Sequence, residues 1–227
     1  MIVITLILIA AIALGTIFSK LLPNNSKATS AEDKTTKIGL QKDSKVNKVS
    51  VDVSKGTSKN NIKDYVAIQC GVFSTAEGAL LLKNSLDEYG APFIIKEGNL
   101  NKVLFGVYPK EGVDSIVKQL KTNKITYVKV NFELTSKDLT SAQTNEMISA
   151  DIKILNKLSE KDTKAIQTVE LKKWMGALKG ADKKNKNYAA MTEIKTYLTA
   201  LPQELKKEKT EEGYLYIYKF IKKMVKI

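Results

Sequence analysis

The stretch YVAIQCGVFSTAEGALLLKNSL, from Tyr65 to Leu86, decides the fold of this chain. Its first residues alternate as in a half-buried β-strand, and the alternation breaks at Gly71. Ser74-Thr75-Ala76-Glu77 then matches a capping box, in which Ser74 accepts from the first free amides of a helix and Glu77 bonds back to the cap. The stretch predicts a strand followed directly by a capped helix.

The same unit occurs again further along the chain, where CGVFS (70–74) recurs as FGVYP (105–109). The strand-like runs APFIIKEG and NKVLFGVYP flank the turn-rich GNLN, a helix is predicted from the apolar spacing over 113–120, and ITYVKV ends the series as a short strand. The order βαββαβ is typical of an antiparallel four-stranded sheet with both helices on one face and the other face open. We therefore expect an α+β fold with a ferredoxin-like or RNP-like domain at 64–134.

The composition narrows the choice of function. The 227 residues are 43% hydrophobic, which is enough for a packed core, and every basic residue is a lysine because no arginine or histidine occurs. The net charge is +13, yet residues 63–134 carry nine lysines against eight acidic residues. A nucleic-acid-binding domain would concentrate positive charge on its recognition surface, and residues 63–134 do not, so we expect no nucleic-acid partner. The single cysteine, Cys70, cannot form an intramolecular disulfide and is expected to face inward as a small apolar residue.

The N-terminal segment predicts a membrane anchor. Residues 1–19 carry no charge, and a helix extending to residue 22 would be about 33 Å long, enough to span a membrane. We expect an uncleaved transmembrane helix at 1–22, with a cleaved signal peptide as the alternative. Residues 23–63 are rich in lysine, serine, threonine and asparagine and are expected to form a disordered linker. Under the positive-inside rule, the lysines of this linker would place it in the cytoplasm. The family resemblance described below instead implies a location outside the cell.

The last part of the chain, residues 136–227, is predicted to form a helical bundle. Four segments carry apolar residues at helical spacing, near Ile148 to Leu155, Leu171 to Leu178, Ile194 to Leu201 and Tyr214 to Val225. The final segment, YLYIYKFIKKMVKI, places its aromatic residues mostly on one face, as core packing requires. Contact of this segment with an anionic membrane or a wall polymer is the alternative.

The motifs at the two strand ends resemble those of the SPOR domain, a family whose first strand commonly reads Val-Gln-x-Gly-Ser-Phe and whose third reads Arg-Val-x-x-Gly-Pro-Phe. Here the matching stretches are YVAIQCGVFST and NKVLFGVYPK, and the resemblance covers about residues 64–133. It implies binding of peptidoglycan glycan strands that lack stem peptides, outside the cell, at sites of septal or sporulation wall remodelling. By position, the family's glutamine corresponds to Gln69 and its basic residue to Lys102. Two residues depart from the family pattern: Val72 stands where serine is usual, and Val107 stands where proline is usual.

Strand parity gives the remaining candidate residues. If Val66, Ile68 and Cys70 face the helices, Ala67 and Gln69 face the open side of the sheet, together with Lys102 and Leu104 on the third strand. A weaker register assignment adds Lys96, Tyr127 and Lys129. An amide such as Gln69 suits acetamido and hydroxyl groups, a tyrosine ring can stack on a sugar face, and the lysines would attract a lactyl carboxylate. The predicted glycan site thus consists of these seven residues.

Catalysis is not expected. Serine hydrolase, cysteine peptidase and zinc amidase sites normally recruit histidine, which this chain lacks, and no spacing suggests a pair of carboxylates across a groove. We therefore expect a non-catalytic protein with no metal or other cofactor. Two alternatives stay open. The first is an RNP-type module that binds single-stranded RNA, but the two central strands lack the outward pair of aromatic residues that such a module uses. The second is a protein-interaction scaffold that acts through the helical bundle, with division or sporulation proteins as partners.

Overall fold

The computed structural model describes residues 61–225. The predicted transmembrane helix at 1–22, and the predicted linker up to residue 60, lie outside the described residues. Within 61–225, no helix is both long enough and apolar enough to cross a membrane. The first strand begins at Asn61, so residues 61–63 belong to that strand.

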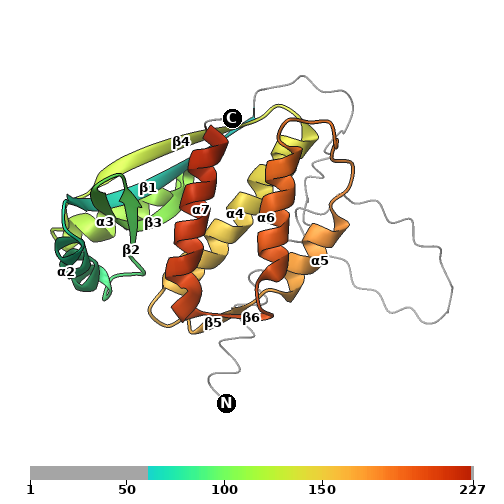
Figure 1. The fold of residues 1–227 in the computed structure, drawn as a ribbon. Helices are drawn as coiled ribbons and strands as arrows, with labels where there is room; N and C mark the ends of the chain where they lie inside the picture. Colours follow the sequence, from blue (N-terminus) through green and yellow to red (C-terminus); the bar gives the residue numbers. More distant parts are fainter. Residues whose placement is uncertain (1–60, 226–227) are drawn as a thin grey trace, which may run out of the picture. The chain divides into compact units, whose positions relative to one another are not determined.

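The predicted βαββαβ order is confirmed. Strands β1 (Asn61–Phe73), β2 (Phe93–Glu97), β3 (Leu100–Pro109) and β4 (Val128–Ser136) form an antiparallel sheet in the order β2-β3-β1-β4 (Figure 1). Helices α2 (Ala76–Leu86) and α3 (Val113–Thr122) connect them, and α3 follows a short 3-10 turn at Lys110–Gly112. Apolar residues of both helices pack against the same face of the sheet, and we call this contact layer the α2/α3 core. The cap of α2 is Thr75, whose hydroxyl accepts from the amide of Gly78 at 3.2 Å, rather than the predicted Ser74.

The repeated Gly-x-aromatic motif marks an irregularity in each central strand. Gln69 pairs with Leu104, and the register shifts on both sides of this pair, which leaves Phe105 of β3 and Cys70 of β1 as extra residues. Each extra residue directly precedes the glycine of its motif, at Gly71 and Gly106. Cys70 packs against the α2/α3 core, which confirms its predicted inward orientation, and burial raises the pKa of its thiol to about 11.

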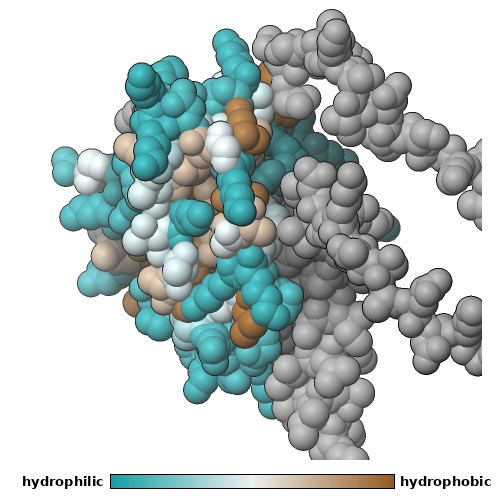
Figure 2. Space-filling view, turned by 90° about the vertical axis from the view of Figure 1, so that its right-hand side faces the viewer, coloured by the Kyte–Doolittle hydropathy of each residue, from teal (hydrophilic) through white to brown (hydrophobic). Residues whose placement is uncertain are grey.

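The C-terminal half contains the four predicted helices. They are α4 (Leu139–Ser159), α5 (Val169–Ala177), α6 (Tyr188–Ala200) and α7 (Thr210–Val225). The sequence indicated no strand in this half, but β5 (Ala165–Gln167) and β6 (Glu204–Lys206) pair antiparallel, and a 3-10 turn at Lys207–Lys209 leads into α7. On the side that carries α5 and α6, small hydrophobic areas lie scattered among hydrophilic residues (Figure 2).

The prediction of an open sheet face is wrong. Helices α4 and α7 pack across the face opposite α2 and α3 (Figure 1), where the side chains of the two central strands join one apolar layer with all four C-terminal helices. We call this layer the C-terminal core. Ala67 and Leu104, both predicted to face solvent, are fully buried in it. The physical reason is composition: the sheet contributes Tyr65, Phe93, Ile95, Val107, Phe132 and Leu134 to this face, which is too apolar to remain in water.

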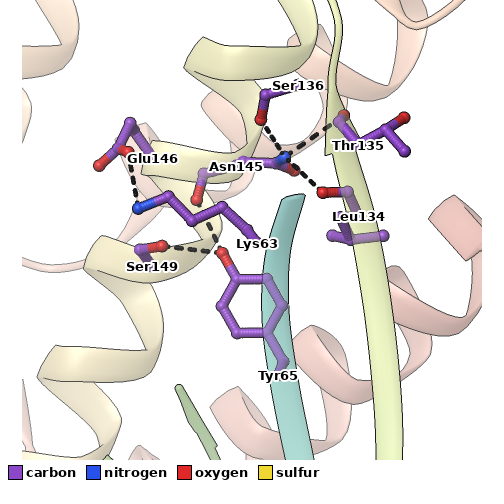
Figure 3. Close-up of polar contacts among 8 residues, drawn as sticks. All are labelled: Lys63, Tyr65, Leu134, Thr135, Ser136, Asn145, Glu146 and Ser149. Carbon is purple, nitrogen blue, oxygen red and sulfur yellow. Dashed lines mark hydrogen bonds and ion pairs between the residues drawn. The ribbon is translucent and has the colours of Figure 1, made fainter. Parts of the chain in front are cut away.

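Polar groups also join the sheet to α4 (Figure 3). The hydroxyl of Tyr65 donates to the carbonyl of Asn145 at 3.0 Å and lies 2.7 Å from the hydroxyl of Ser149. The side-chain amide of Asn145 donates to Ser136 Oγ at 2.7 Å and points toward the carbonyls of Leu134 and Thr135. Because these groups are buried or partly buried and paired, they specify how α4 lies on the sheet.

Candidate functional site

One end of the sheet face extends beyond the covering helices. The strand pairing directs five side chains to this face: Gln69 and Val72 of β1, Leu100 and Lys102 of β3, and Val128 of β4. Val72 and Leu100 are each 44% exposed and Val128 is 57% exposed, whereas Gln69 and Lys102 are half-buried. We call these five residues the uncovered patch.

Strand pairing makes this patch continuous. Gln69 lies opposite Val128 on one side and the buried Leu104 on the other, and Val72 lies opposite Lys102. Directly opposed residues on one face have Cβ atoms about 5 Å apart. The extra residue Cys70 turns β1 so that Val72, three positions after Gln69, shares its face. The patch therefore presents one amide among exposed aliphatic side chains.

Lys102 and Lys222 share one carboxylate, that of Glu97. Lys102 Nζ donates to Glu97 Oε2 at 2.8 Å, and Lys222 Nζ of α7 donates to Glu97 Oε1 at 2.6 Å. Partial burial disfavours the charged carboxylate, but the hydrogen bonds from the two lysines outweigh it and lower the pKa of Glu97 to about 2. This pair of contacts ties the β2–β3 hairpin to α7 and fixes the position of Lys102 at the edge of the patch.

Three predicted site residues lie on the opposite face of the sheet. Lys129 pairs with Ile68, whose side chain points into the α2/α3 core, and its Nζ lies 3.6 Å from Asp114 Oδ1 of α3. Tyr127 packs against the same core, and Lys96 follows the parity of Ile94, which also packs there. The predicted outward direction of Lys96, Tyr127 and Lys129 is therefore wrong, because β2 and β4 pair one residue out of the expected register.

The structure thus brings two of the seven predicted residues, Gln69 and Lys102, onto an accessible part of the predicted face. Ala67 and Leu104 lie on that face but beneath α4 and α7, where no polymer can reach them. The sequence reasoning missed Val72, Leu100 and Val128. Leu100 had a sequence signal, as an apolar residue at outward parity near a strand end, whereas Val72 and Val128 reach this face only through the extra residue Cys70 and the register of β4.

The described residues offer no metal centre: within 61–225 no three histidine, cysteine, aspartate or glutamate side chains gather to hold an ion. The patch can bind a ligand through one amide with donors and acceptors, three aliphatic side chains, and a lysine that shares the Glu97 carboxylate with Lys222.

Comparison with known proteins gives one partial likeness. No protein-family model matches the chain, and no curated protein matches it in sequence. Among solved structures, it is similar to the solution structure of the peptidoglycan-binding domain of the B. subtilis cell wall lytic enzyme CwlC. The identity is 18%, the match covers 35% of this chain and 98% of that chain, and the TM-score is 0.28. This is a weak and partial likeness to a cell-wall-binding domain, at a score too low to establish a common fold.

Proposed function

We propose that the protein binds peptidoglycan glycan strands that lack stem peptides, through the uncovered patch centred on Gln69. The observation that carries the proposal is that Gln69 and Lys102, the two residues singled out by the resemblance to the SPOR family, share an accessible end of the sheet face. The patch is smaller than the fully open face that the sequence predicted, so it is suited to a short run of sugar units.

The chemistry of the patch fits a bare glycan. The Gln69 amide can donate to and accept from an acetamido or hydroxyl group, and the exposed side chains of Val72 and Val128 can cover the apolar face of a sugar ring. Lys102 and Lys222 share the one negative charge of Glu97, so this group keeps a net positive charge that would attract a lactyl carboxylate. Discrimination against mature wall would then rest on this charge and on the bulk of the stem peptide.

The cellular part of the proposal rests on the sequence. Residues 1–22 would anchor the protein in the cell membrane as a single span, and residues 23–60 would let the folded part reach the wall on the extracytoplasmic side. In this arrangement the protein is non-catalytic and needs no cofactor. It would gather at septal or sporulation sites, where amidases expose bare glycan, and the C-terminal helices would be available to division or sporulation proteins.

A retention assay tests the proposal. Full-length protein is incubated with amidase-treated sacculi, untreated sacculi and single-stranded RNA. We expect retention on the treated sacculi, a loss of at least fivefold in Gln69→Ala and Val128→Asp, and no change in Lys129→Ala, which alters the other face of the same sheet. Equal retention of Gln69→Ala and wild type would remove the site assignment, and retention by RNA alone would replace glycan with RNA as the ligand.

A further inference from the structure

A second site is separate from the uncovered patch. A cavity of about 510 Å³ opens between the end of α2, helix α3 and the C-terminal end of α4. A neighbouring hollow of about 230 Å³ shares Glu88, Tyr89, Ser159 and Lys161 with it and extends it toward Lys207. Both volumes together fall in the range of small-molecule sites, and no residue of the patch lines either of them.

The cavity combines aromatic rings with uncharged hydrogen-bonding groups. Its lining includes Tyr89, Phe105 and Tyr108 as rings, Gln119 and Asn156 as amides, and Ser115 and Ser159 as hydroxyls. Aromatic faces beside amides and hydroxyls suit a ligand that carries both apolar ring faces and many hydroxyl or amide groups.

In each of the two amide side chains, Gln119 and Asn156, only one of the two polar atoms makes a hydrogen bond to another described residue. Gln119 Nε2 donates to the carbonyl of Tyr89 at 3.0 Å, and Asn156 Oδ1 accepts from the hydroxyl of Tyr214 at 2.6 Å. Among the described residues, the Gln119 Oε1 acceptor and the Asn156 Nδ2 donors have no such partner. The two side chains are therefore fixed in place, with an unused acceptor and an unused donor group in the wall of one cavity.

Tyr108 adds a hydroxyl group to the wall of the cavity. The residue lines the cavity while only 5% exposed, and none of the described residues hydrogen-bonds its hydroxyl. The Tyr108 hydroxyl oxygen is not one of the fully buried polar atoms of the described residues that lack a partner, so it is open to the cavity and can pair with a ligand hydroxyl or acetamido group.

The charges in the wall exclude an anionic ligand. The two hollows are lined by the acidic residues Asp87, Glu88 and Glu160 and by the lysines Lys161 and Lys207, so their walls carry no excess of positive charge. Lys207 Nζ is also occupied, because it donates to the main-chain carbonyl of Glu160 at 2.6 Å. A phosphate or polyanion therefore finds no cationic cluster here, whereas an uncharged polyhydroxylated ligand meets no penalty.

We propose that this cavity binds one or two units of a neutral N-acetylated amino sugar. The choice of sugar rests on the proposed function, while the preference for a neutral, hydroxyl-rich ligand rests on the wall itself. In this arrangement one sugar ring lies against Tyr89, and its hydroxyl and acetamido groups pair with Gln119, Asn156 and the hydroxyl of Tyr108. The protein would then hold glycan at two separate places, the patch and this cavity.

Calorimetric titration of the full-length protein with the β-1,4-linked trimer of N-acetylglucosamine tests the cavity. Tyr108→Phe, which removes only the hydroxyl, is expected to weaken binding about fivefold to tenfold. Tyr89→Ala and the cavity-filling Ser115→Trp are expected to weaken it more than tenfold, and a thermal melt of each variant verifies folding. Lys129→Ala, at a residue that lines neither the cavity nor the uncovered patch, is the matched control and should bind the trimer as the wild type does.

The outcomes separate this proposal from the proposed function. The cavity proposal is overturned if the trimer does not bind the wild type, or if it binds Tyr89→Ala and Ser115→Trp as tightly as the wild type. Either result counts against the cavity even if Gln69 is needed for retention on sacculi. Trimer binding that depends on Tyr89 supports the cavity even if Gln69→Ala leaves retention on sacculi unchanged, a result that removes the patch alone.

Discussion

The hydroxyl of Tyr65 on β1 lies 2.7 Å from the hydroxyl of Ser149 on α4, and both residues are buried (Figure 3). This contact joins the sheet to a helix more than eighty positions later in the chain. Tyr65 also donates to the carbonyl of Asn145, so its hydroxyl uses both its donor and its acceptor capacity. Burial raises the pKa of Tyr65 well above its ordinary value, and the residue stays neutral at every physiological pH.

Tyr65→Phe should therefore destabilise the protein without creating a cavity. We expect a loss of about 1–3 kcal/mol in the free energy of unfolding, because the change removes both hydrogen bonds that the buried hydroxyl makes to α4. Urea denaturation measures this loss. Tyr127→Phe is the control, since none of the described residues hydrogen-bonds that hydroxyl, and it should change stability by less than about 0.5 kcal/mol. Equal effects in the two variants would contradict the role of the contact.

The glycines of the repeated motif make a second prediction. A Cβ atom at Gly106 would lie 2.5 Å from the hydroxyl oxygen and 2.7 Å from Cζ of the buried Tyr108 ring, and one at Gly71 would lie 2.7 Å from the ring of Phe73. Gly106→Ala should cost at least about 2 kcal/mol, because the ring must move within a packed core. Thermal and urea unfolding measure the effect.

The same substitution at Gly112 gives the contrast. A Cβ there meets no heavy atom within 4 Å. Gly112→Ala should be neutral or stabilise by up to about 1 kcal/mol, because it reduces the freedom of the unfolded chain. Similar losses at both glycines would show that crowding by the aromatic ring is not the cause.

The ion pairs of Glu97 predict that the wild type is more stable than Glu97→Gln by an amount that depends on pH. The pKa of Glu97 is lowered from an ordinary value near 4.5 to about 2 in the folded protein, so its ionisation stabilises the fold above that ordinary value. This stabilisation is lost as the pH falls from about 4.5 to about 2. Glu97→Gln should therefore cost about 1–2 kcal/mol at pH 7 and much less near pH 2–3. A wild-type-minus-variant difference in unfolding free energy that stays constant over this range would refute the assignment.

Asp151 predicts the opposite dependence. Its side chain is fully buried in α4 and neither carboxylate oxygen has a hydrogen-bond partner among the described residues. Burial raises its pKa from 3.8 to about 8, so the folded state binds a proton that the unfolded state releases above pH 4. Stability should fall by about 1.4 kcal/mol per pH unit between roughly pH 4 and pH 8 through this group. Asp151→Asn should remove that slope, and unfolding free energies at pH 5, 6 and 7 measure it.

The sequence by itself determined the order of the elements, since that order depends on local signals. Alternation, helical spacing and turn residues are properties of neighbouring positions, and they placed the four strands of the sheet, the helices between them and the four C-terminal helices. The repeat of CGVFS as FGVYP likewise indicated that the two central strands end in the same way. The short pairing of β5 with β6 left no such local signal.

Only the tertiary structure decided which parts of the sheet meet water. The run VLFGVY in β3 is apolar at both parities, as in strands that are buried on two sides, but sequence alone did not say what covers the second face. The two extra residues at Cys70 and Phe105 and the register of β4 depend on pairing partners far along the chain. They turned Lys129 and Tyr127 toward α3 and left Gln69 at the accessible end, because a shift of one residue moves a side chain to the other face.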